Sequence, residues 1–227
     1  MKYWASIPII LSIMSLLLGG RFVLGAATVA HKTVLLDVPF TAQAPLGNWK
    51  DPRQQHGCEE ASVLMALRWA RGKTLFATQA QQQILAMADW EQKKYGNYVD
   101  TSAIDTAERL VKKYAGYENV SVRYDIGVQD IKDELDNGNV VVAPMNGRLL
   151  KNPYFKRPGP LQHMLLIRGY DNTRGEFITN DPGTRRGKGY RYPYAILMGA
   201  LRDYPTGNNE EIKNVRTAMI VIKKISP

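Results

Sequence analysis

The sequence predicts an α+β fold in one domain, in which helices come first along the chain and an antiparallel sheet follows. Two patterns indicate this order. Between residues 58 and 136, apolar side chains recur at the three- and four-residue spacing of amphipathic helices. From residue 139 onward, short apolar runs alternate with turns, as in antiparallel sheets. The sequence has no internal repeat and no linker that would divide it into two domains.

The first half is expected to open with a short strand over 33–40, followed by a polar loop rich in Pro and Gly over 41–55. Recognisable start and stop residues delimit the helices that follow. Thr78 is a good N-cap, and Gly72 and Gly116 are typical helix ends. The expected helices span 58–71, 78–94, 101–115 and 128–136, with a strand over 120–124 before the last of them.

The second half is expected to supply most of the sheet. Residues 163–170 and 176–180 are strand-like, and the turn Asp171-Asn172-Thr173-Arg174-Gly175 separates them, so they predict a hairpin. The expected strands span 139–145, 163–170, 176–180 and 217–223, with a basic loop over 148–160 and a short helix over 193–201.

Composition limits the classes of function. With 227 residues and 44% apolar residues, the chain can bury a core. A single cysteine excludes a disulfide framework and a Cys-rich zinc site, and no cluster of ligands has metal-binding spacing, so we expect no metal and no cofactor. The net charge of +9 indicates a basic surface or attraction to an anionic partner, such as a cell-wall polymer or an acidic substrate. No nucleic-acid-binding module is present, so we expect no nucleic-acid partner.

Residues 1–27 predict an export signal. Lys2 gives a positive start, Ala5 to Leu18 is an uncharged apolar run, and Gly25-Ala26-Ala27 offers small residues for cleavage. The run is shorter than the roughly 20 residues of a spanning helix. The alternative is an uncleaved N-terminal membrane anchor. In either case, we expect a folded domain over 33–225 that is secreted or attached to the cell envelope and touches membrane only through an uncleaved leader.

The only cysteine, Cys58, is expected in the first turn of a helix. The positive end of the helix dipole favours thiolate there, and thiolate is the form that attacks carbonyl groups. The alternative interpretation is a small, buried apolar residue. His56 lies two residues away at a turn, where neighbouring side chains rarely face each other. It is therefore interpreted as a surface or gating residue rather than as the base.

His163 opens the first strand of the expected hairpin, and Asp181 follows the second. Pairing of the two strands brings Asp181 beside His163, as a catalytic base requires of its orienting carboxylate. Without that partner, His163 would be interpreted as a core residue. Acyl transfer also requires a donor to the developing oxyanion. The backbone N–H of Cys58 is one candidate, Gln43 is the preferred side-chain donor, and Gln55 is the alternative.

Four segments carry a family resemblance: Leu36-Asp37-Val38-Pro39-Phe40-Thr41-Ala42-Gln43, Gly57-Cys58-Glu59-Glu60-Ala61-Ser62, Gln162-His163-Met164-Leu165 with Gly169-Tyr170-Asp171, and Asn180-Asp181-Pro182-Gly183-Thr184. They resemble the free-standing relatives of the bacterial bacteriocin-processing peptidases. This papain-like cysteine peptidase family cleaves after double-glycine leaders in its exporter-linked members. The resemblance covers about residues 36–203. It implies a papain-like fold in which Cys58 is the nucleophile, His163 the base, Asp181 its partner and Gln43 the oxyanion glutamine.

The sequence departs from the family in two places. Many relatives carry glycine directly after the cysteine, whereas this chain carries Glu59. It also has no transporter segment, so double-glycine specificity is not implied. The expected function is an exported cysteine peptidase (a thiol hydrolase) that cuts a peptide or peptide-like amide bond in a peptide or protein through an acyl-enzyme. The alternatives are a catalytically weak peptide- or wall-binding module on the same fold, or a related amide chemistry such as transpeptidation.

Two further features admit a functional interpretation. The basic run over 185–191 is either a solvated loop or the edge of a cleft that favours acidic peptides or wall polymer. Trp49 and Trp90 either flank a peptide groove or pack within the protein. The substrate-binding residues are otherwise not predicted.

Overall fold

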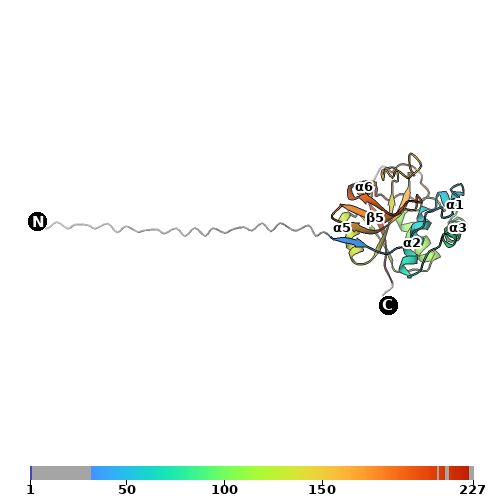
Figure 1. Ribbon diagram of the computed structural model, residues 1–227, viewed down its shortest axis with the longest axis horizontal. Helices are drawn as coiled ribbons and strands as arrows, with labels where there is room; N and C mark the ends of the chain where they lie inside the picture. The colour runs from blue at the N-terminus through green and yellow to red at the C-terminus, as the bar shows by residue number, and fades with distance from the viewer. Residues whose placement is uncertain (2–31, 209, 213–214, 225–227) are drawn as a thin grey trace.

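The computed structural model describes Met1 and residues 32–208, 210–212 and 215–224, so the expected leader over 1–27 lies outside the described residues. One antiparallel sheet organises the described chain, in the order β2-β7-β3-β4-β5-β6, and β1 pairs with β4 (Figure 1). Its strands are β1 (Thr33–Leu35), β2 (Val120–Tyr124), β3 (Val140–Met145), β4 (His163–Asp171), β5 (Glu176–Asn180), β6 (Lys188–Pro193) and β7 (Ala218–Ile222).

Helices cover both faces of this sheet. They are α1 (Pro52–Gln55), α2 (Cys58–Ala70), α3 (Ala77–Tyr95), α4 (Ala103–Thr106), the π-helical η1 (Ala107–Tyr114), α5 (Val128–Asp136) and α6 (Tyr194–Ala200). The apolar residues of α2, α3 and η1 share one core cluster with the sheet, and those of α5 and α6 share another. Helices, sheet and helices therefore form three layers (Figure 1).

The central strands are apolar along their whole length because both of their faces are buried. Val140 and Val142 of β3 point into the cluster with α2, whereas Val141 and Ala143 point into the cluster with α5 and α6. This alternation between two buried faces explains why 139–145 is a continuous apolar run and not an apolar–polar pattern. The expected α+β fold class, with the early helices packed on an antiparallel sheet, is confirmed.

Several elements differ from the expectation. Helix α3 begins at Ala77 with Phe76 at its N-cap and no side-chain cap, so the N-cap predicted at Thr78 is wrong. The strand expected over 33–40 ends at Leu35. Leu36 N still donates to Arg168 O, and Arg168 Nε donates to Leu36 O. The loop expected over 41–55 contains α1, in which Asp51 caps the N-terminus and Pro52 occupies the first turn. Part of the basic run over 185–191, interpreted as a loop or a cleft edge, forms the edge strand β6.

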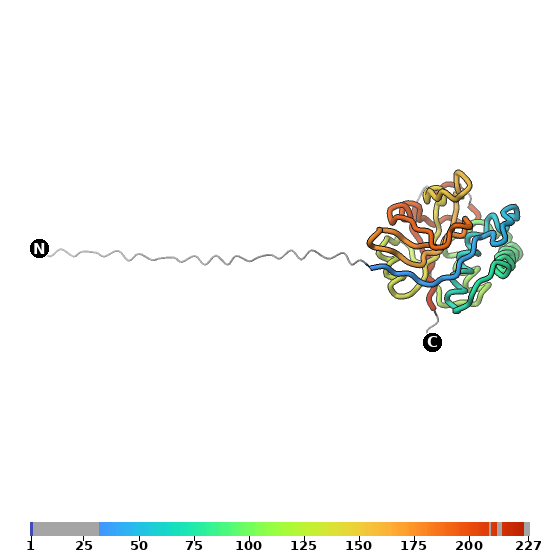
Figure 2. The backbone as a smooth tube through the Cα atoms, in the orientation of Figure 1, coloured from blue at the N-terminus to red at the C-terminus, as the bar shows by residue number. Residues whose placement is uncertain are grey.

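The segment between β1 and α1 runs across the side of the molecule that faces the viewer in Figure 2, from the sheet to the layer that contains α2. Gln43 N donates to Pro182 O over 2.9 Å, which fixes this segment beside the chain that leaves β5. Among the described residues, no helix has both the length and the apolar character needed to cross a bilayer.

Candidate active site

Cys58 begins helix α2 directly after a glycine that no other residue could replace without movement. A Cβ atom at Gly57 would lie 2.7 Å from Arg53 O and 3.1 Å from a methyl group of Ile84. The missing side chain at Gly57 thus allows α1 and α2 to lie close together, and α2 begins at the next residue, Cys58. The Cys58 side chain is buried, with 5% of its surface exposed, yet it reaches the wall of a cleft.

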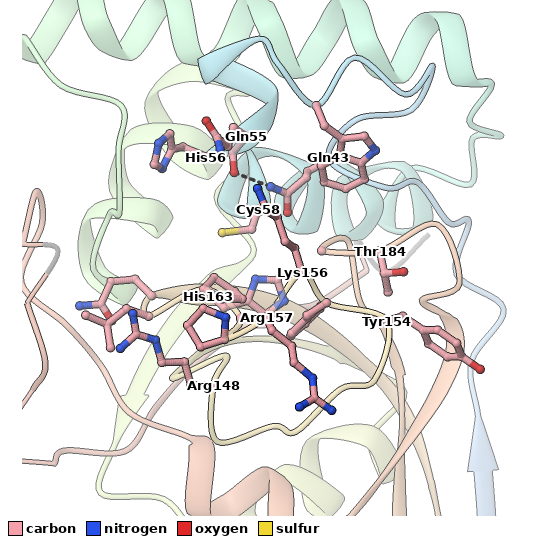
Figure 3. Close-up of a pocket in the computed structure, with 18 of the residues that line it drawn as sticks. Gln43, Gln55, His56, Cys58, Arg148, Tyr154, Lys156, Arg157, His163 and Thr184 are labelled. Carbon is pink, nitrogen blue, oxygen red and sulfur yellow. Dashed lines mark hydrogen bonds between the residues drawn. The ribbon is translucent and has the colours of Figure 1, made fainter.

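His163, the first residue of β4, lines the same cleft as Cys58 (Figure 3). Helix α2 packs on β4, and Ser62 Oγ donates to Met164 O over 3.2 Å next to the histidine. The expected hairpin of β4 and β5 is confirmed, and it brings Asp181 Oδ1 to 2.9 Å from His163 Nε2. Because Nε2 is engaged with Asp181, Nδ1 is the ring nitrogen left to accept a proton from a nucleophile.

Asp181 is fully buried and held from several sides. Its Oδ1 also accepts from Gly183 N over 2.9 Å, and its Oδ2 accepts from Tyr192 Oη over 2.6 Å and from Asn152 Nδ2 over 3.4 Å. Burial raises the pKa of Asp181, but the charge of His163 and these hydrogen bonds outweigh it and hold the pKa below its usual value. Asp181 is therefore a carboxylate at neutral pH.

The partners Tyr192 and Asn152 were not anticipated from the sequence. Tyr192 lies in β6, directly after the run 185–191 that was interpreted as a loop or cleft edge, and Asn152 lies in the long loop between β3 and β4. Nothing in the local pattern around either residue indicates a contact with Asp181, because both contacts depend on the packing of distant segments.

Gly183 lies against the imidazole. A Cβ atom there would be 2.8 Å from Phe155 Cε1, 3.0 Å from His163 Cε1 and 3.2 Å from Asp181 Oδ1. We expect Gly183→Ala to displace the His163 ring and to lower kcat about 10-fold, since small misplacements of catalytic groups are costly. Steady-state kinetics and a thermal melt check this. A loss of activity that only follows a loss of folded protein would contradict it.

Gln43 lies in the cleft, but its amide hydrogens are already engaged. Nε2 donates to Gln54 O over 3.0 Å and to Gln55 O over 2.7 Å, both at the C-terminal end of α1. Figure 3 shows the bond to Gln55. A side-chain NH₂ group has two hydrogens, so donation to a substrate oxyanion requires one of these bonds to be exchanged. The role of Gln43 stays a prediction. Gln55, exposed and also lining the cleft, remains the alternative.

The thiol of Cys58 is bonded to its own neighbour. Sγ donates to Glu59 Oε2 over 3.0 Å, whereas no hydrogen bond to His163 is found among the described residues. Burial, and next the charge of Glu59, raises the pKa of Cys58 well above its usual value. Both effects oppose the thiolate that the helix terminus is expected to favour.

Glu59 also links Cys58 to strand β4, which carries His163. Its Oε1 accepts from Tyr204 Oη over 2.8 Å, and the same hydroxyl lies 3.3 Å from the backbone oxygen of His163. Glu59 and Tyr204 are both buried. The carboxylate thus points inward and not to solvent, and it belongs to the packing between α2 and β4.

Further carboxyl groups lie in the same interior. Glu59, Glu60 and Glu91 have no exposed surface, and both side-chain oxygens of Glu60 and Glu91 lack a hydrogen-bond partner among the described residues. Burial, together with the charges of neighbouring carboxylates, raises the pKa of Glu59 to about 7 and that of Glu91 to about 8. The pKa values of Glu60 and Asp100 are raised for the same main reason. No group of side chains in the described part of the chain could hold a metal ion.

These carboxyl groups predict the pH dependence of stability. Their pKa values are higher in the folded than in the unfolded chain, so the folded state keeps protons that the unfolded state releases above its pKa of 4.5. The stabilisation is complete below that value and is lost as pH rises through about 7 and about 8. Each proton is worth about 1.4 kcal/mol per pH unit. We expect the melting temperature to fall across this range, and Glu91→Gln to flatten the profile. A melting temperature that rises with pH would contradict this.

Three other predicted residues have clear positions. His56 is half-buried at the end of α1 and lines the cleft, as a gating residue would. Trp49 also lines the cleft. Trp90 instead packs edge-on between Tyr95 and Tyr114, with ring centroids 5.6 and 5.4 Å apart, so it does not flank a groove.

The cleft itself has a volume of about 1070 Å³. It is bounded by the segment before α1, by the start of α2, by the loop between β3 and β4 and by the chain after β5. This volume lies just above the roughly 300–1,000 Å³ found for small-molecule pockets.

Comparison with known proteins gives a consistent picture. The Peptidase_C39 like family matches residues 35–209, which confirms the resemblance drawn from the four sequence segments. A crystal structure of a protein from Bacillus anthracis, described as a C39-like peptidase, matches with a TM-score of 0.52 at 15% identity, and the match covers 86% of this chain and 100% of that chain. At that identity it supports the fold. No match was found among curated proteins.

Proposed function

Because this chain belongs to the Peptidase_C39 like family, we propose that it is a cysteine peptidase that hydrolyses a peptide or peptide-like amide bond. The observation that carries the proposal is the position of Cys58, at the start of α2, in one cleft with a His163 whose Nε2 is held by Asp181 at 2.9 Å. A nucleophile, a base and an orienting carboxylate on separate elements form the arrangement that acyl transfer requires.

The steps follow from these positions. His163 Nδ1 takes the thiol proton as Cys58 Sγ bonds to the carbonyl carbon, and the resulting imidazolium gives that proton to the leaving amine. The C–N bond breaks and leaves a thioester on Cys58. Water, deprotonated by His163, then attacks the thioester, releases a carboxylic acid and restores the thiol. The backbone N–H of Cys58 and the amide of Gln43 or Gln55 are the proposed oxyanion donors.

The test is a digest of a broad peptide library by the full-length protein, with and without prior treatment with iodoacetamide. We expect new peptide termini in the untreated digest and none after treatment. Since the chain has one cysteine, mass spectrometry should find one label per chain, on Cys58. Cleavage that persists with Cys58 fully labelled overturns the proposal. An added amine acceptor, captured in the product, would identify transpeptidation instead of hydrolysis.

The second candidate is a peptide- or wall-binding module with weak turnover or none. The bond from Cys58 Sγ to Glu59, with the raised thiol pKa, is the observation that favours it. A module of this kind would bind the same peptides in wild type and in Cys58→Ala, and the library digest would contain no new termini. Saturable binding with turnover that requires Cys58 excludes it.

We also propose that the chain works outside the cytoplasm, secreted or attached to the envelope. The support is the sequence of residues 1–27, with its apolar run between Lys2 and the small residues at 25–27. Cell fractionation and the mass of the mature N-terminus distinguish a cleaved signal from a retained anchor. Recovery of the intact chain only from the cytoplasm would contradict export.

A further inference from the structure

We infer that the cleft selects peptides that carry acidic side chains close to the scissile bond. This inference rests on the proposed function, and it concerns the substrate class of the same site. Six basic residues line the cleft together with Cys58 and His163, and they come from three separate segments. They are Lys50, Arg148, Lys156, Arg157, Arg185 and Arg186.

These cations lack carboxylate partners. All six are exposed, and none forms an ion pair within the described residues. Some arginines elsewhere on the surface are paired, as Arg53 is with Asp51, Arg123 with Asp130 and Arg216 with Asp125. Six cations without an ion pair therefore gather around one cleft, and no carboxylate that the structure describes neutralises them there by direct pairing.

The opposing charge within the cleft is small. Asp100 is the only carboxylate among the lining residues, and it is nearly fully buried. Burial raises its pKa. A cleft lined by one sign of charge concentrates field lines and attracts ligands of the opposite sign.

Several of these basic side chains are held in place by contacts with neighbouring residues. The Arg186 guanidinium lies over the Tyr154 ring at 4.9 Å from its centroid. Arg185 lies against Gly47, where a Cβ atom would come within 2.2 Å of Nη2 and where φ is +85°. Arg148, Lys156 and Arg157 surround the mouth in which Cys58 and His163 lie (Figure 3). Preplaced guanidinium groups suit carboxylates, which accept two parallel hydrogen bonds.

An acidic peptide fits this site better than a phosphate-bearing wall polymer. The proposed reaction breaks an amide bond, so the polymer that is cut must contain one. The cations also surround the cleft from several sides and do not converge on one point, as suits separate carboxylates along an extended chain. The phosphate polymer is therefore treated as an outcome of the test.

The test compares peptides that the enzyme cleaves with variants of the same peptides in which Asp and Glu become Asn and Gln. We expect kcat/KM to fall about 10-fold or more for the neutral peptides, and the difference to shrink at high salt because of screening. Equal or faster cleavage of the neutral peptides overturns the inference. The inference is also overturned if a wall polymer inhibits cleavage while the enzyme shows no preference for acidic over neutral peptides.

Charge reversal in the protein gives a matched control. Arg148→Glu with Lys156→Glu changes the cleft, whereas Lys93→Glu with Lys94→Glu changes the net charge equally on the exposed side of α3, outside the cleft. We expect the cleft pair to lose the preference for acidic peptides and the α3 pair to keep it. Equal effects of the two pairs would overturn the inference, because they would show a response to net charge alone.

Failure of the peptidase proposal remains distinguishable from failure of this inference. Fluorescence anisotropy with Cys58→Ala measures binding of the acidic and neutral peptides without turnover. Tighter binding of the acidic peptides, with no cleavage by wild type, overturns the peptidase proposal and supports the selection. Cleavage without any charge preference in binding or kcat/KM supports the peptidase proposal and overturns the selection of acidic peptides.

Discussion

We expect Asp181→Ala to lower kcat/KM by about 10²- to 10⁴-fold, the range found for general acid–base groups. Alanine leaves His163 Nε2 without its partner at 2.9 Å in a site where both side chains are almost fully buried. The imidazole then loses the group that fixes its tautomer and stabilises its charged form. Kinetics of the two proteins across a range of pH, on one cleaved peptide, measure the loss.

Asp181→Asn serves as the matched comparison and is expected to retain more activity than Asp181→Ala. An amide oxygen at the Oδ1 position can still accept from the imidazolium N–H, so orientation is kept while the charge is lost. The hydroxyl of Tyr192 at 2.6 Å can accept from the new amide hydrogens. Thermal melts must show that both variants fold. Equal activity of Asp181→Ala and wild type would remove Asp181 from the site.

The fold and the main site residues were predictable where they follow from local pattern. Apolar spacing located α2, continuous apolar runs located the central strands, and the turn at 171–175 predicted the hairpin that brings Asp181 to His163. A strand whose two faces are both buried is a continuous apolar run, and this pattern predicted the strand over 139–145.

The remaining features depend on contacts between distant segments. Strand β6 is polar and basic and lies at the edge of the sheet. Its sequence resembles that of a loop, and only its pairing with β5 identifies it as a strand. Tyr192 and Asn152 contact Asp181 only through that pairing and through the long loop after β3. The inward direction of Glu59 was open from the sequence, because a helix residue next to the nucleophile can face solvent or core. Its partner Tyr204 is 145 positions away.

Glu59 gives the second large expected effect, on the reactivity of the nucleophile. The ionised carboxylate accepts from Cys58 Sγ at 3.0 Å and opposes loss of the thiol proton. Burial, followed by the charge of Asp100, raises the pKa of Glu59 to about 7. Below that pH the carboxyl group is neutral and can itself donate to a thiolate. Above it, the negative charge suppresses the thiolate that rising pH would otherwise produce.

We therefore expect Glu59→Gln to raise the rate of Cys58 alkylation about 10-fold or more at about pH 8, because each unit taken off the thiol pKa gives about ten times more thiolate. At about pH 5.5, where Glu59 is already neutral, the two proteins should differ much less. Iodoacetamide labelling rates across this range provide the measurement, and the single cysteine makes the label unambiguous.

Glu60→Gln is the matched control for this experiment. Glu60 is the next residue along α2 and is equally buried, and burial, followed by the charge of Glu91, raises its pKa well above the usual value. It has no hydrogen bond to Sγ. Its replacement should leave the labelling profile close to that of wild type. If Glu60→Gln accelerates labelling as much as Glu59→Gln, relief of general crowding among the carboxyl groups explains the effect, and direct control of the thiol by Glu59 is wrong.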